Sequence, residues 1–117
     1  VMDRVQREGA VAVLFRKVSA TEGIVLADEF MGLVPLAGKR LYYQPFEFKM
    51  LAEAGVWDET KFLSSIADGE FDLILWYEPP NWPAIESRWT ARQRELIQNF
   101  YTRDGASEFT ALLRPKR

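Results

Sequence analysis

The strongest constraint on the fold of this chain is an alternation of short apolar segments with helical patterns between residues 23 and 76. Ile24–Ala27 is a continuous apolar run, of the kind that is buried on both faces of a parallel sheet. Phe71–Trp76 is a longer run in which Asp72 is the only polar residue. Strands separated by helices favour parallel pairing through right-handed crossovers, so this block predicts an α/β fold.

The segments between these two strands predict three helices and one more strand. Asp28 stands where an N-cap is expected, ahead of a short helix over 29–37 that Pro35 shortens or kinks. A strand is predicted over Leu41–Tyr43 and a helix over Phe46–Ala54, ended by Gly55. Another helix follows Asp58 and ends at Gly69, with its apolar side chains inward: Phe62, Leu63 and Ile66.

Both ends of the chain carry their own patterns. Apolar residues spaced at three and four positions predict a helix over Val5–Val18, with a strand over 11–15 as the alternative. Thr90–Gln93 fits a capping box that opens a helix with these inward residues: Leu96, Ile97, Phe100 and Tyr101. Asp104-Gly105 predicts a turn, and Phe109–Leu113 predicts the last strand.

We therefore expect residues 1–117 to form one α/β domain, a small three-layer sandwich. Its sheet would be mostly parallel, with about four strands and with helices on both faces. The short turn before the last strand leaves open an antiparallel position for that strand at an edge. A chain of 117 residues is long enough to bury a core of this kind.

Composition excludes several kinds of chemistry. The chain has no cysteine and no histidine, so thiol nucleophiles, disulfides, zinc-thiolate sites and histidine bases are all ruled out. A net charge of -2 gives no basic footprint for nucleic acid. No apolar run approaches the ~20 residues that span a bilayer. We expect no cofactor, and the start at Val1 without Met favours a fragment of a longer protein, with tag removal or processing as alternatives.

Polar residues follow the ends of the predicted strands, where ligands gather in open α/β sheets. They are Asp28 and Glu29, then Tyr43 and Gln44, then Tyr77 and Glu78. Two carboxylates across a cleft suit acid–base chemistry or a divalent ion. The favoured interpretation is simpler, with Asp28 as a helix cap and with Glu29 and Glu78 in solvent. No glycine-rich phosphate loop follows any strand, which disfavours a nucleotide site.

Aromatic residues and one arginine surround the proline-rich loop over 78–83. Exposed Trp and Tyr rings suit stacking on sugar faces or a membrane interface. The alternative is that these rings fill a small core. The aromatic residues are Trp76, Tyr77, Trp82 and Trp89, and the arginine is Arg88. The basic tail over 114–117 is either attracted to anionic headgroups or solubilising.

Six short motifs occur in an order and spacing that carry a resemblance. They are VLADE over 25–29, LAGK over 36–39, YYQPFEF over 42–48, LAEAGVWD over 51–58, FDLIL over 71–75 and RWT over 88–90. The chain resembles the C-terminal extramembrane domain of bacterial multi-pass glycosyltransferases. These are similar to dolichyl-phosphate-mannose–protein mannosyltransferases and to lipid A arabinose-transferase-like proteins. The resemblance spans about residues 11–115, with 23–115 as the family-like core and 1–22 as a linker-like helix.

The resemblance implies an integral membrane enzyme with a polyprenyl-phosphate-linked sugar donor. The family's catalytic acidic residues lie between transmembrane helices, so none is carried over onto this chain. The implied domain lies on the extracytoplasmic side, beside the transmembrane part of the same chain and near the membrane surface. Its expected contacts with sugar, acceptor or membrane core are Tyr77, Glu78, Trp82, Arg88 and Trp89.

Two other functions stay open from the residues alone. One is a free-standing α/β binding module for a small ligand or a protein, which would use Asp28, Gln44 and Glu78 at the strand ends. The other is a small hydrolase using Asp28 and Glu78. The hydrolase is the least favoured, because the chain offers no activated nucleophile and such a pair would need a raised pKa.

Overall fold

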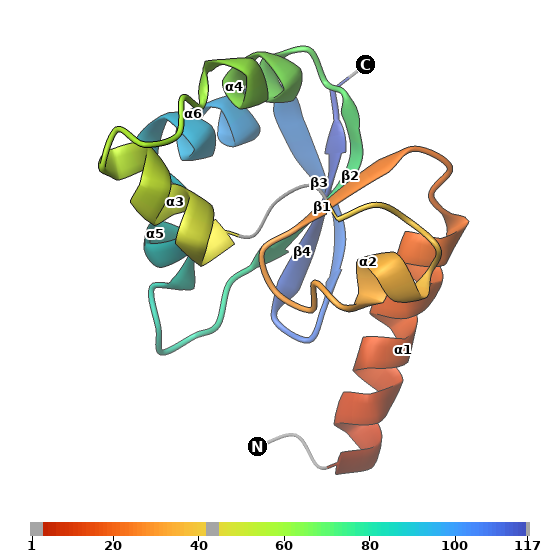
Figure 1. Ribbon diagram of the computed structural model, residues 1–117. Helices are drawn as coiled ribbons and strands as arrows, with labels where there is room; N and C mark the ends of the chain where they lie inside the picture. The colour runs from red at the N-terminus through yellow and green to blue at the C-terminus, as the bar shows by residue number, and fades with distance from the viewer. Residues whose placement is uncertain (1–3, 42–44, 117) are drawn as a thin grey trace.

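The computed structural model describes residues 4–41 and 45–116 as one mixed sheet with helices packed on both of its faces (Figure 1). The strands are β1 (Ile24–Ala27), β2 (Phe71–Tyr77), β3 (Tyr101–Ser107) and β4 (Thr110–Pro115). The helices are α1 (Arg4–Ala20), α2 (Leu33–Leu36), α3 (Pro45–Glu53), α4 (Thr60–Ala67), α5 (Ala84–Arg88) and α6 (Ala91–Phe100). Helices α1 and α2 lie on one side of the sheet and α3 to α6 on the other (Figure 1).

The prediction of a mostly parallel sheet is wrong. The strand order is β1-β2-β4-β3, and only β1 and β2 pair in parallel, through the crossover that contains α2, α3 and α4. Strand β4 is antiparallel to both of its neighbours, and it lies inside the sheet rather than at an edge. A hairpin therefore completes the sheet, with β4 inserted against β2 and with β3 at the outer edge.

The hairpin was not predicted because its turn lacks the residues that are usual in such turns. Ser107 pairs with Thr110, so Glu108 and Phe109 form a two-residue loop with φ of 49° and 55°. Such a turn normally takes Asn or Gly, since both central residues need positive φ. Asp104-Gly105, the predicted turn, instead lies within β3, where the register shifts between Arg103 and Ala106.

Strand β2 divides the core into two clusters because its side chains alternate between the faces. Leu73 and Leu75 pack on the side of α1 and α2, together with Leu14, Val18, Val25, Ala27, Val34 and Leu112. Ile74 and Trp76 face the other helices, in a cluster that includes Leu26, Ile66, Trp89, Ile97 and Tyr101. Strand β2 is apolar on both faces because helices cover both sides of the sheet. This does not require its neighbours to be parallel: β1 is parallel to it and β4 is antiparallel.

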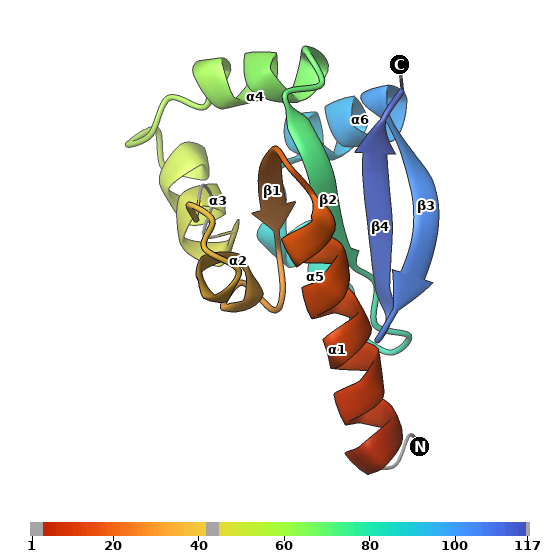
Figure 2. The same cartoon turned by 90° about the vertical axis from the view of Figure 1, so that its right-hand side faces the viewer.

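Helix α1 is confirmed over the strand alternative, and it belongs to the packed body. Leu14 and Val18 are fully buried against the sheet. Ser107 Oγ donates a hydrogen bond to the Ala10 carbonyl at 2.9 Å, which ties α1 to the hairpin. The first turns of α1 extend beyond the sheet (Figure 2).

The predicted helix over 29–37 is mostly wrong. Only Leu33–Leu36 is helical, and Phe30 has a φ of 55°, which a helix cannot accommodate. Asp28 is therefore not an N-cap. Of the strand predicted over 41–43, Tyr42 and Tyr43 lie outside the described residues, and Leu41 is in no strand.

The later helices agree better with the sequence. Helices α3 and α4 are confirmed to within about one residue of their predicted bounds. The capping box is confirmed: Gln93 N–H donates to Thr90 Oγ1 at 3.2 Å, and Thr90 N–H donates to Gln93 Oε1 at 3.1 Å. Ile97 is buried as predicted, whereas Phe100 is 42% exposed and Tyr101 opens β3.

A substitution at Gly23 tests the junction between α1 and β1. A Cβ at Gly23 would collide with the Asp72 carboxylate, which accepts the Ile24 N–H at 3.2 Å. Gly23→Ala should therefore lower the free energy of unfolding by about 1–3 kcal/mol, because the carboxylate must turn away from its donor. Urea denaturation measures this change.

The matched control is Gly9→Ala in α1. Apart from the chain neighbours of Gly9 and the backbone of its own helix, no atom of the described residues lies within 4 Å of a Cβ at this position, so alanine should stabilise the helix by up to about 1 kcal/mol. Equal effects of the two substitutions would contradict the proposed close approach of Asp72 to Gly23.

Candidate functional site

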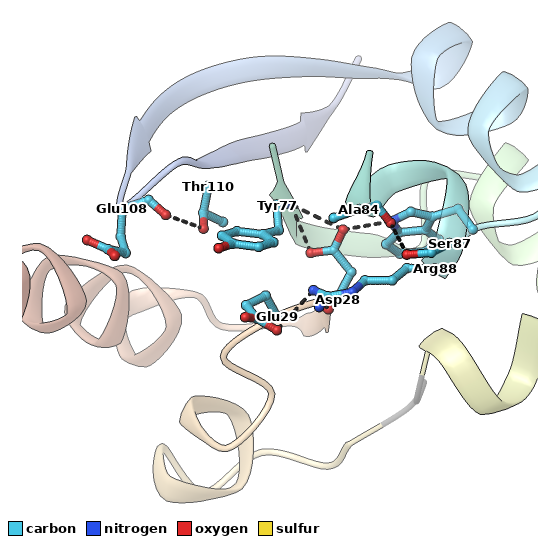
Figure 3. A network of polar contacts seen from close by, with 9 residues as sticks. Asp28, Glu29, Tyr77, Ala84, Ser87, Arg88, Glu108 and Thr110 are labelled. Carbon is cyan, nitrogen blue, oxygen red and sulfur yellow. Dashed lines mark hydrogen bonds and ion pairs between the residues drawn. The ribbon is translucent and has the colours of Figure 1, made fainter. Parts of the chain in front are cut away.

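The candidate site lies where β1 and β2 end side by side. Because the two strands are parallel, Asp28, which follows β1, and Tyr77, the last residue of β2, lie at the same edge of the sheet. Helix α5 brings Arg88 to this edge, and Trp89 follows it directly. Figure 3 shows Asp28, Glu29, Tyr77 and Arg88 converging from these three segments.

Asp28 is 1% exposed, and its carboxylate is held by donors from two directions. The Tyr77 backbone N–H donates to Oδ1 at 2.9 Å and to Oδ2 at 3.1 Å. The Trp89 indole Nε1–H donates to Oδ2 at 2.7 Å. One buried side chain thus links the end of β1 to the end of β2 and to the residue after α5.

Burial raises the pKa of Asp28 from 3.8 to about 7. The hydrogen bonds from Trp89 and Tyr77 and the charge of Arg88 act in the opposite direction, since each favours the ionised carboxylate. A raised carboxyl pKa is one requirement for a general acid, but both oxygens already accept hydrogen bonds from the protein. The geometry therefore assigns Asp28 a structural role.

Arg88 joins the backbone that follows β1 to the surface. Its Nη1 donates to the Asp28 carbonyl at 2.6 Å and to Glu29 Oε1 at 2.9 Å. The guanidinium carbon also lies 5.3 Å from the centre of the Tyr77 ring and 4.8 Å from that of Trp82. Because a guanidinium is planar, it can stack on aromatic rings while its N–H groups stay bonded at the edge.

The predicted aromatic residues divide into buried and exposed ones. Trp89 is fully buried and stacks on Trp76 at a centroid distance of 5.4 Å. Trp82 is 47% exposed and meets the Tyr77 ring edge to face at 6.2 Å. The core-filling interpretation thus describes Trp76 and Trp89, while Trp82 is held at the surface by Arg88 and Tyr77.

Other predicted residues do not join this cluster. Glu78 pairs with Arg103 of β3 at 2.6 Å, and its side chain is 36% exposed. Gln44 lies outside the described residues, so the predicted cleft of Asp28, Gln44 and Glu78 stays a prediction. Within residues 4–41 and 45–116, no group of acidic side chains is arranged to hold a metal ion.

A hollow of about 320 Å³ lies beside Trp82. The loop after β2 forms one wall, and α5 and α6 supply the polar residues that sequence reasoning missed: Glu86, Arg94 and Gln98. A wider hollow of about 610 Å³ lies at the opposite end of the sheet, near Gly23 and Asp72. The hollow at Trp82 is the better candidate because it joins an exposed aromatic ring to several polar side chains.

The sequence analysis did not predict helix α5, and without this helix the hollow could not be expected. Its signals were present in the sequence: Pro83 at its start, Glu86 in its first turn and Arg88 in its last. At five residues it has too few apolar positions to show a periodicity.

No protein-family model, no curated protein and no solved structure matches this chain. In the part of the chain that the structure describes, no helix has both the length and the apolar character needed to cross a bilayer. Function must therefore be argued from the site and from the motifs.

The raised pKa of Asp28 predicts an unusual dependence of stability on pH. The folded state holds the Asp28 proton up to about pH 7, whereas the unfolded chain releases it near pH 3.8. The contribution of Asp28 to the free energy of unfolding should therefore fall as pH rises from about 4 to about 7. Asp28→Asn should flatten this slope, which urea denaturation across the same pH range measures.

Asp58→Asn is the control for this experiment. Asp58 is exposed, and hydrogen bonds from Thr60 lower its pKa, so its titration lies below the window of Asp28. In this control, the free energy of unfolding should still fall between about pH 4 and about pH 7, the range set by the two pKa values of Asp28. A slope that survives in Asp28→Asn would show that another group titrates there.

Proposed function

We propose that this chain is a non-catalytic accessory domain of an integral membrane glycosyltransferase that uses a polyprenyl-phosphate-linked sugar donor. Its partner would be the transmembrane part of the same polypeptide, and it would lie on the extracytoplasmic side. There it would help the enzyme to engage the acceptor or the donor. The order of the six sequence motifs supports the parent class.

The observation that carries the proposed role is the fixed presentation of Trp82. Arg88 packs on this ring while bonded to Glu29 and to the Asp28 carbonyl, and Asp28 is itself locked between β2 and Trp89. An aromatic ring that is half exposed and is contacted by Arg88 and Tyr77 suits contact with a sugar face. Preorganisation lowers the entropy lost on binding.

A non-catalytic role agrees with the chemistry of the described residues. The chain has no histidine or cysteine, and both carboxylate oxygens of Asp28, the described buried carboxylate whose pKa is raised, already accept hydrogen bonds from the backbone and an indole. Glu78 is engaged with Arg103 at the surface. The hydrolase that would use Asp28 and Glu78 is thus not favoured.

Fractionation of source cells tests the parent class directly. An antibody raised against this domain should detect a band several-fold larger than 13.5 kDa in the membrane pellet, released only by detergent. A band near 13.5 kDa in the supernatant would contradict the proposal and leave a free-standing binding module.

Replacement of Trp82 tests the role of the surface ring. In the parent enzyme, Trp82→Ala should lower the transfer rate about tenfold through loss of a stacking contact, without unfolding the domain. Phe100→Ala is the matched control, because Phe100 is exposed to a similar extent (42% against 47%) and does not line the hollow. Normal turnover of Trp82→Ala would remove this loop from the mechanism.

A further inference from the structure

We infer that the hollow beside Trp82 is a subsite for one neutral pyranose ring. This inference rests on the proposed function for its biological setting, since it names the class of ligand that the domain would meet. The site is formed by the loop after β2 with α5 and α6, and it uses Trp82, Glu78, Glu86, Arg94 and Gln98. Its volume of about 320 Å³ accommodates one sugar ring with its hydroxyl groups.

The ring of Trp82 supplies the apolar half of the recognition. Pyranoses have an apolar face of C–H groups, and a flat aromatic surface matches that face. Arg88 and Tyr77 contact the ring, and the ring also lines the hollow. Pro79 and Pro83 flank the loop and restrict its backbone, so the ring is presented in a fixed position.

The polar residues supply the other half. A sugar hydroxyl both donates and accepts, so its recognition needs donors and acceptors close together. Arg94 and Gln98 lie four residues apart on the same side of α6, and Glu86 faces them from α5. Arg94 Nη1 and Glu86 Oε1 are 4.0 Å apart, too far for a hydrogen bond, so their N–H and oxygen groups can reach a ligand.

The charges favour a neutral sugar over an anionic one. Each of the two carboxylates that line the hollow lies beside a guanidinium: Glu78 pairs with Arg103, and Glu86 lies 4.0 Å from Arg94. Glu78 Oε1 accepts a hydrogen bond from Arg103, and its second carboxylate oxygen can accept one from a sugar hydroxyl. A phosphate or uronate would find no excess of positive charge here to offset the loss of its hydration. The same charges disfavour anionic headgroups as the occupant of this hollow.

An NMR titration of the full chain with methyl pyranosides of glucose, mannose and galactose tests the inference. At least one pyranoside should shift the indole N–H signal of Trp82 and the side-chain amide of Gln98 in a saturable way. Trp82→Ala and Gln98→Ala should each weaken this binding about tenfold, and Phe100→Ala should leave it unchanged. Glucuronate should bind more weakly than glucose.

Several results would overturn the inference. They are the absence of shifts with every pyranoside, equal shifts with glycerol, or unchanged binding in Trp82→Ala. Burial of Trp82 in phosphatidylcholine vesicles without any pyranoside shift would assign the ring to a membrane instead. The outcome is separable from the proposed function: pyranoside binding by a chain that fractionates as a free 13.5 kDa protein would keep the subsite and remove the membrane parent.

Discussion

The buried carboxylate of Asp28 is the interaction on which the candidate surface depends. A carboxylate in an apolar interior is costly unless it is hydrogen-bonded, and this one accepts from the backbone of Tyr77 and from the indole of Trp89. These bonds fix the separation of β1, β2 and the end of α5. Arg88 is thereby held beside Glu29, and Trp82 rests on Arg88. The position of an exposed ring is thus determined by a side chain that solvent does not reach.

Local patterns in the sequence predicted the elements with strong signals. The capping box at Thr90 and the apolar runs of β1 and β2 each had one dominant physical cause. The sheet order was not predictable from the same signals, because apolar runs do not show strand direction. The hairpin in particular was concealed by a turn made of Glu108 and Phe109.

The candidate site was predictable in its residue types but not in their roles. Tyr77, Trp82 and Arg88 were identified together from their closeness in sequence, and the structure places them in contact. Asp28 looked like a helix cap because a short polar residue follows a strand. Its partners lie 49 and 61 residues away, so only the fold could reveal them. Glu86, Arg94 and Gln98 join the site through helix packing.

The place of β4 has a consequence for how the chain is made. β4 is the last strand in chain order, yet it lies between β2 and β3. During synthesis, β1 and β2 would therefore be present while the far edge of β2 still lacked its neighbour. An unpaired apolar edge can join other chains. Nascent chains of this protein would thus be vulnerable to aggregation until both β3 and β4 have left the ribosome, which makes emergence of this hairpin the step that completes the sheet.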